Sequence, residues 1–188
     1  MNDPHVKVTL EPLKRFARVI HADTKAGGNG PIWQAILQWG VRYRRFILRR
    51  FNKFSRGGGD WAKLKKSTIA ARKRKKARRG YSGPRSFSIL QDTGMLKAAL
   101  KPNFTAAAGA LQERIRGGIR VGYGGPGRHP KGKATVADIA SFHHVGNRYM
   151  KPRKIIVDPD ARTVRGMETD MERALERLGK QCERAGGS

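Results

Sequence analysis

Apolar residues recur at helical spacing in two long stretches of this chain. From Pro31 to Phe54, and again from Val164 to Cys182, they follow a 3.6-residue period. A shorter stretch of this kind follows Pro12. We therefore predict a short N-terminal helix, a long core helix over 31–54 with a basic outer face, and a C-terminal helix. Gly40 falls on the stripe of the long helix, so another element can approach closely there.

Three other segments have the pattern of β-strands. Residues 5–10 alternate polar and apolar side chains, and apolar residues between 111 and 121 flank Gly117-Gly118, a pair that favours a two-residue hairpin turn. A short apolar run at 154–157 is also strand-like. The chain therefore predicts an α+β fold, in which a small antiparallel sheet is packed by the long helix and the C-terminal helix.

Two shorter elements complete the predicted fold. Ile89 and Leu90 are followed by four turn-forming or capping residues, 91–94, and then by apolar residues at helical spacing up to Leu100. We predict a turn, a cap and a short amphipathic helix there. Another short helix is predicted from Val136 to Gly146.

Positive charge is the strongest feature of the composition. The chain has 41 Lys and Arg against 14 Asp and Glu, a formal net charge of +27, and residues 61–85 hold 11 of those basic residues and no acidic one. We expect a single domain over 1–188 with a basic arm or loop at 70–85 and a flexible loop at 124–135. No segment has the pattern of a signal peptide or a membrane span.

The block within the basic arm is a candidate contact site. A run of like charges repels itself and is usually disordered until it meets a partner. A polyanion or an acidic protein is the favoured partner, while a nuclear-localisation signal and a merely solvated segment are the alternatives. The contact residues are Arg72, Lys73, Arg74, Lys75, Lys76, Arg78 and Arg79.

Residues that could perform catalysis or hold a metal are sparse. His143 and His144 are adjacent, so on a helix they point about 100° apart and cannot easily bind one ion. Cys182 falls on the apolar stripe of the last helix, where a cysteine behaves as a small hydrophobic residue. Asp92 and Asp138 have no acidic partner for general acid–base work. We predict no catalytic residue, no metal site, no cofactor and no enzyme.

Short motifs follow one another in a characteristic order over residues 55–157. A Gly-rich turn precedes a Trp, a Leu and a Ser-Thr pair; an Ile-Leu-x-Asp-Thr-Gly-x-Leu core, a Val-Gly strand, a His-x-x-Gly turn and a Pro-Arg pair come after it. This order resembles the phage virion morphogenesis family, the tail-completion proteins of Mu-like tailed phages. The matching residues are Gly58, Gly59, Trp61, Leu64, Ser67, Thr68, Ile89, Leu90, Asp92, Thr93, Gly94, Leu96, Val121, Gly122, His143, Gly146, Pro152 and Arg153.

The resemblance implies a non-enzymatic virion protein that completes the tail or joins it to the head. It implies a homo-oligomeric ring, with a hexamer favoured, assembled in the host cytoplasm into the tail or neck. Its expected neighbours are neck, connector, tail-tube or sheath proteins, with possible contact to genomic DNA and none to a membrane. The alternative is a non-specific nucleic-acid-binding basic protein, which lacks a recognisable base-reading motif here.

Overall fold

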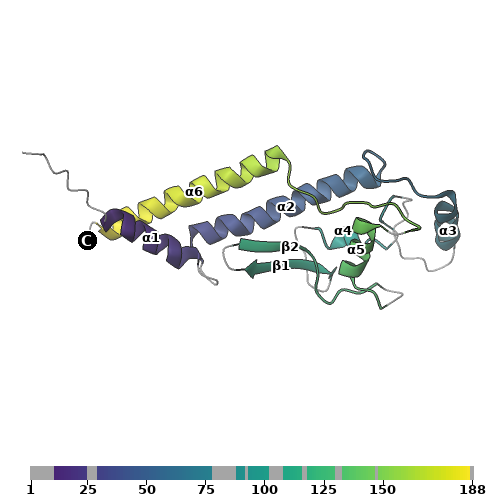
Figure 1. The fold of residues 1–188 in the computed structure, drawn as a ribbon, viewed down its shortest axis with the longest axis horizontal. Coiled ribbons are helices and arrows are strands. Elements are labelled where there is room, and N and C mark those ends of the chain that lie inside the picture. Colours follow the sequence, from purple (N-terminus) through teal and green to yellow (C-terminus); the bar gives the residue numbers. More distant parts are fainter. Residues whose placement is uncertain are drawn as a thin grey trace, which may run out of the picture.

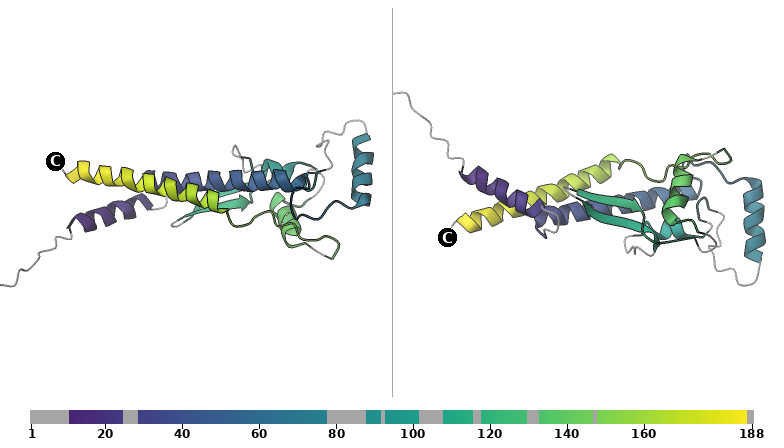
Figure 2. Two further views of the ribbon diagram at one scale, coloured as in Figure 1. Left: turned by 90° about the horizontal axis from the view of Figure 1, so that it is seen from above. Right: turned by 60° about the horizontal axis from the view of Figure 1, so that its bottom comes forward.

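The computed structural model describes residues 11–24, 29–77, 88–91, 93–101, 108–115, 118–129, 133–146 and 148–186. They form a mixed α+β fold that is long in one direction (Figure 1). α1 and the end of α6 lie at one end, and α3 lies across the other end (Figure 2). The elements are α1 (Glu11–Thr24), α2 (Pro31–Ser55), α3 (Lys66–Ala77), α4 (Met95–Ala98), β1 (Ala110–Ile115), β2 (Gly118–Tyr123), α5 (Val136–Val145) and α6 (Ala161–Gly186).

α2 is the central element, and it begins where the sequence predicted. Pro31 occupies its first turn, where a missing N–H has no cost. The next N–H, of Ile32, has no partner within the helix and donates to Asp23 Oδ2 at 2.7 Å. The end of α1 is thereby tied to the start of α2.

The two-stranded sheet and α6 lie on opposite sides of α2 (Figure 1). β1 and β2 pair antiparallel, with Ala110 opposite Tyr123 and Ile115 opposite Gly118. A Cβ at Gly40 would lie 2.9 Å from Ile119 Cδ1, so glycine permits the close approach of the sheet to α2 that the sequence predicted. The predicted α+β fold, with a small sheet and two long helices, is thus present.

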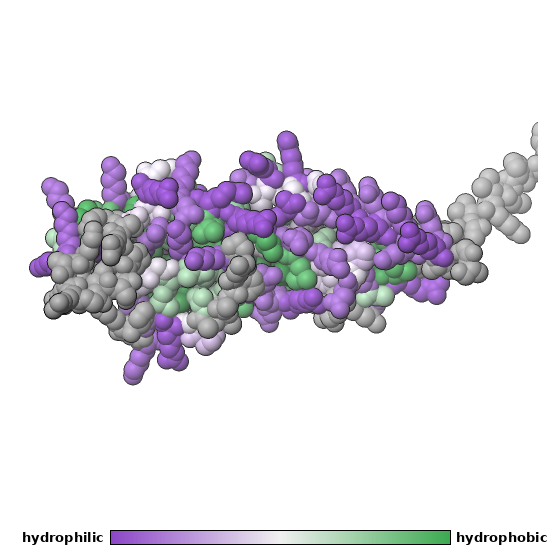
Figure 3. Space-filling model, turned by 180° about the vertical axis from the view of Figure 1, so that it is seen from behind, coloured by the Kyte–Doolittle hydropathy of each residue, from purple (hydrophilic) through white to green (hydrophobic). Residues whose placement is uncertain are grey.

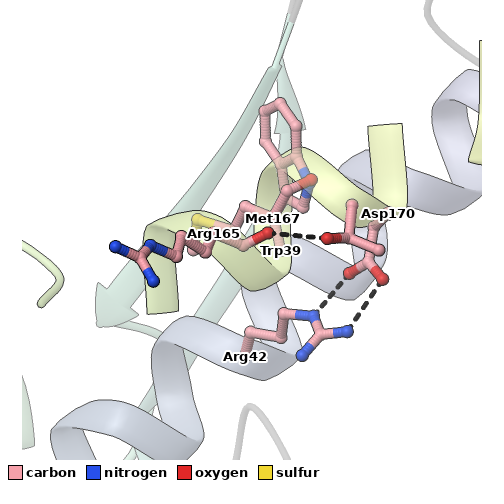
Figure 4. A network of polar contacts seen from close by, with 6 residues as sticks. Trp39, Arg42, Arg165, Met167 and Asp170 are labelled. Carbon is pink, nitrogen blue, oxygen red and sulfur yellow. Dashed lines mark hydrogen bonds and ion pairs between the residues drawn. The ribbon is translucent and has the colours of Figure 1, made fainter. Parts of the chain in front are cut away.

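α6 begins at a sequence-encoded cap and is attached to α2 by polar contacts. Asp160 Oδ1 accepts a hydrogen bond from Thr163 N at 2.9 Å, as an N-cap residue does. Farther along, Trp39 Nε1 donates to the Met167 carbonyl at 2.8 Å, and Arg42 forms an ion pair with Asp170 (Figure 4). Arg42 therefore takes part in the α2–α6 interface, while its side chain stays 41% exposed.

Two apolar clusters lie along α2. The smaller one, at the α1 end, joins Ile32, Trp33 and Ile36 of α2 to Leu178 of α6. Leu175, on the predicted stripe of α6, is 40% exposed, so this part of the stripe prediction is wrong. The larger cluster contains Ile47, Phe51, Trp61, Ile89, Leu90, Leu96, Ala99, Leu100, Ala110, Val136, Ala140 and Ile155.

The basic arm predicted at 70–85 requires a correction. Residues 70–77 belong to α3, because alanine, lysine and arginine are strong helix formers even where they bury little. The remainder, 78–85, lies outside the described residues, as does the strand predicted at 5–10.

The segment 154–157 is not a strand, contrary to the prediction. Ile155 is buried, but side chains and not a neighbouring strand bind the backbone carbonyls of this segment. Trp61 Nε1 donates to the Lys154 carbonyl at 3.3 Å, and the Tyr43 hydroxyl donates to the Val157 carbonyl at 2.9 Å. Buried polar groups of the backbone can be satisfied in this way without a sheet.

Two turns also differ from the predictions. Gly118 pairs with Ile115, so it belongs to β2 and not to the turn predicted at Gly117-Gly118; residues 116–117 lie outside the described residues. The cap of α4 is Gly94, at φ +76° and without a side-chain hydrogen bond. Gln91, expected to help in capping, instead donates to Ser55 Oγ at 2.7 Å. The loop expected at 124–135 is drawn together by a β-bridge between its positions 128 and 135.

Candidate functional site

A large hollow lies at the α3 end of the molecule, between α3, α4, α5 and the loops beside them. Its volume is about 1270 Å³, above the range of about 300–1,000 Å³ that is typical of small-molecule sites. We call it the basic pocket. It is lined by Ala62, Lys63, Leu64, Lys65, Thr68, Arg72, Leu90, Thr93, Met95, Leu96, His129, Lys133, Ala134, Val136, Ile139, His143, Arg148, Tyr149, Met150, Lys151, Pro152 and Arg153.

The lining is basic and contains no acidic residue among those described. Five of its cations have exposed side chains and form a rim, while Arg72 is half-buried and Arg153 is buried. Apolar side chains of the larger core cluster, including Leu90, Leu96 and Val136, lie beneath them. The rim cations are Lys63, Lys65, Lys133, Arg148 and Lys151.

Arg153 is held in place by the backbone. It is 8% exposed, and its Nε and Nη2 donate to the Ala62 carbonyl at 3.3 and 3.0 Å. Its own N–H donates to the His143 carbonyl at 2.6 Å, which fixes the loop after α5. Burial, and then the positive charge of Arg72, lower the pKa of Arg153. No described carboxylate forms an ion pair with it, so its charge is uncompensated within the described chain.

His143 adds to this unfavourable concentration of positive charge. Burial, followed by the charges of Arg153 and Arg72, lowers the pKa of His143 to about 4. Its Nδ1 is buried and has no hydrogen-bond partner among the described residues. A negatively charged group entering the basic pocket would relieve the repulsion among these three side chains, because opposite charge favours the protonated forms.

Eight of the 18 motif residues found in the sequence line this pocket. Trp61 forms edge-to-face contacts with Phe51 and Phe54, at centroid distances of 5.4 and 5.5 Å, and anchors the loop that carries Lys63 and Lys65. Motif residues that line the pocket come from three segments separated by up to about 90 positions. They are Leu64, Thr68, Leu90, Thr93, Leu96, His143, Pro152 and Arg153.

Glycines of the motif shape the backbone near the pocket. Gly94 and Gly146 have φ of +76° and +78°, a conformation that favours glycine. A Cβ at Gly146 would lie 2.8 Å from both the Met150 carbonyl oxygen and Pro152 N. The His-x-x-Gly turn is therefore structural at its glycine. Asp92 lies outside the described residues.

The basic block is only partly joined to the pocket. Arg72 lines it and donates from Nη1 to the Ser88 carbonyl at 2.7 Å, while Lys73 and Arg74 are exposed on α3. Lys75 and Lys76 belong to α3, and Arg78 and Arg79 lie outside the described residues. Sequence reasoning missed the five rim cations, which are scattered singly over three segments and form a cluster only in the folded chain.

Metal-ligand clusters and membrane-spanning helices are the other features for which the described residues can be searched. No group of three His, Cys, Asp or Glu side chains there is placed to hold a metal ion. None of its helices has the combined length and hydropathy of a membrane-spanning segment. Comparisons with protein-family models, curated proteins and solved structures find no match to this chain.

Proposed function

We propose that this chain is a structural virion protein of a tailed bacteriophage, which completes the tail or joins it to the head as a ring of identical subunits. The observation that carries the proposal is that eight of the 18 motif residues, from three segments of the chain, line one basic pocket. Motifs separated by up to about 90 positions would not need to meet if their order along the chain were accidental.

The composition of the surface also supports a component of an assembly. A formal net charge of +27 opposes a compact isolated monomer and favours acidic or polyanionic neighbours. Phe142 and Val145 of α5 and Tyr149 of the pocket lining are 59, 69 and 68% exposed, so large apolar side chains lie on the surface. Such residues are buried when neighbouring subunits or other neck and tail proteins pack against them.

The test is the mass and the negative-stain appearance of the full chain after nuclease treatment. Measured at about 0.15 M and about 1 M salt, closed rings of defined copy number at either concentration support the proposal. A protein that stays monomeric at both, even when concentrated, contradicts self-assembly as its function.

A free nucleic-acid-binding protein is the second candidate, and the exposed basic residues Lys73 and Arg74 on α3 favour it. Contacts of this kind would be made to phosphates, and each neutralised phosphate would steepen the salt dependence by about 0.9 log units. Tyr149 is the one Phe, Trp or Tyr side chain among the described residues of the pocket lining, which limits base stacking. A monomer that becomes large only with added DNA would favour this candidate.

A further inference from the structure

The lining of the basic pocket is complementary to a group that combines negative charge with apolar surface. The five rim cations together with Arg72 and Arg153 give the pocket seven Lys and Arg side chains. Its apolar lining, which we call the floor, consists of leucine, methionine, valine and isoleucine side chains. A phosphate backbone matches the rim but offers nothing apolar to the floor. A protein surface in which carboxylates flank an aliphatic side chain matches both.

α6 carries such a surface. Residues 158–183 contain seven of the 14 acidic residues of the chain. Glu168, Glu172 and Glu176 follow one another at four-residue spacing, so they lie along one side of α6, and all three are exposed. Leu175, 40% exposed, lies on the same side beside Glu172. We call these four residues the acidic stripe.

The glutamates of the acidic stripe have no ion-pair partner among the described residues. All four residues are exposed, so the described part of the chain does not cover the stripe. Hydrophilic surface runs along the upper edge of the face seen in Figure 3, where α6 lies. Asp170, by contrast, faces α2 and forms an ion pair with Arg42. The stripe is thus an acidic row on a helix whose other exposed positions include Arg173, Arg177 and Lys180.

The stripe and the pocket lie in different parts of the molecule. α6 runs from the middle of the molecule toward the α1 end, whereas the pocket lies between α3, α4 and α5 at the other end (Figure 1). One chain therefore does not bring its own stripe to its own pocket. A second copy can do so.

We propose that the acidic stripe of one copy docks in the basic pocket of the next, with Leu175 against the apolar floor and Glu172 and Glu176 against the cationic rim. The proposal rests on the ring function proposed above and names the subunit contact. Because two different surfaces meet, the contact is heterologous, and such contacts generate closed rings or open filaments.

The test is a charge exchange in the full chain, read out by sedimentation velocity at about 0.15 M salt. Glu172→Lys with Glu176→Lys should weaken self-association at least about tenfold, because it places like charges together. Lys63→Glu with Lys151→Glu in the rim should do the same. A mixture of these two doubly substituted chains should recover association, since the altered stripe then meets the altered rim.

A matched control distinguishes loss of the contact between stripe and rim from a general effect of net charge on self-association. Asp60→Lys with Glu113→Lys changes the charge by the same amount at exposed positions outside the stripe and should leave association within about twofold. Circular dichroism of every variant verifies folding.

Each outcome is decisive. Association that survives the stripe substitutions, or is not recovered in the mixture, overturns the docking proposal while rings seen by microscopy still support the proposed function. If association recovers in the mixture but microscopy finds no rings, the docking proposal is supported and the proposed ring function is contradicted. Rim substitutions that abolish DNA binding but leave association intact assign the pocket to nucleic acid and overturn the proposal.

Discussion

Arg42 of α2 and Asp170 of α6 form a two-point ion pair between the two longest described helices. Arg42 Nε lies 2.5 Å from Asp170 Oδ2, and Nη2 lies 2.8 Å from Oδ1 (Figure 4). The hydrogen bonds from Arg42 are the main cause that lowers the pKa of Asp170. The pair joins residues 128 positions apart in the sequence. Its stability therefore reports on the packing of α6 against α2 within one chain.

The pH dependence of this pair follows from the lowered pKa of Asp170. A carboxylate whose pKa is lower in the folded state contributes stability above its unfolded pKa of about 3.9, and the contribution is lost as pH falls through the folded value. We expect Asp170→Asn to cost about 1 kcal/mol at pH 7, since Arg42 is 41% exposed and partly screened by water.

Urea unfolding of both proteins between pH 7 and pH 3 checks this expectation. The difference in unfolding free energy should narrow below about pH 4, where Asp170 of the unfolded chain takes up a proton. Glu183→Gln, which removes an exposed carboxylate of α6 outside the acidic stripe, is the matched control and should change stability by less than about 0.5 kcal/mol. Equal effects of the two substitutions would contradict a stabilising pair.

Arg44 is predicted to be the most important charged residue of the core. It is 1% exposed and donates to the Ala99 carbonyl at 2.8 Å, to Gln112 Oε1 at 3.1 Å and to the Leu111 carbonyl. Both Arg44→Lys and Arg44→Met should lower the free energy of unfolding by about 3 kcal/mol, because neither replacement serves three acceptors at once.

Thermal and urea unfolding of the Arg44 variants provide the measurement. Arg45→Met, at the exposed neighbouring position, should change stability by less than about 0.5 kcal/mol. A Met variant as stable as the original protein would show that the acceptors around Arg44 are satisfied without it.

The contrast between Arg44 and its neighbours shows what the sequence could predict. Periodicity was enough to place α2, because each apolar position follows the preceding one by three or four residues. Arg44 also falls on that stripe, four residues after Gly40 and three before Ile47. Its burial depends on acceptors at 99–112, which local spacing does not reveal.

The basic pocket, like the burial of Arg44, could be predicted only in part, because it is formed by residues distant in the sequence. Its motif residues were recognisable in the chain, and Arg72 belonged to an obvious basic block. Lys133 and Lys151, however, are ordinary isolated lysines until the loops beside α5 bring them to one rim. Clusters of residues that are distant in the sequence become visible only in the folded chain. The same holds for the contact that we propose for the acidic stripe.

Gly109 provides a test of a close approach that the sequence did not indicate. It has φ of +79°, and a Cβ there would lie 2.4 Å from Val136 Cβ. Gly109→Ala should therefore cost about 2–3 kcal/mol, combining backbone strain with a clash at the start of α5.

Gly179→Ala is the matched substitution for Gly109→Ala. Gly179 lies within α6, and a Cβ added there would meet no neighbouring atom within 4 Å, so alanine should gain up to about 1 kcal/mol from helix propensity. Chemical denaturation compares the two. Equal effects in the same direction would contradict the close packing of Val136 on Gly109.

His143 gives a direct electrostatic measurement of the basic pocket. Burial and the charges of Arg153 and Arg72 lower its pKa to about 4, so the ring is neutral at pH 7. A histidine whose pKa falls on folding favours the native state fully above its unfolded value of about 6.5, and stability decreases as pH falls toward 4. One proton can contribute a slope of at most about 1.4 kcal/mol per pH unit.

Four results follow from the causes of the lowered pKa of His143. An NMR titration of its imidazole should have a midpoint near 4, and His143→Gln should flatten the loss of stability between about pH 6.5 and pH 4. Arg72→Gln should raise the midpoint but leave it below 6.5, because burial is the larger cause. Inorganic phosphate, used as a probe anion, should also raise the titration midpoint of His143 when the phosphate enters the pocket. A midpoint near 6.5 in the unmodified protein would mean that His143 lies in water and that the cations around it do not form one site.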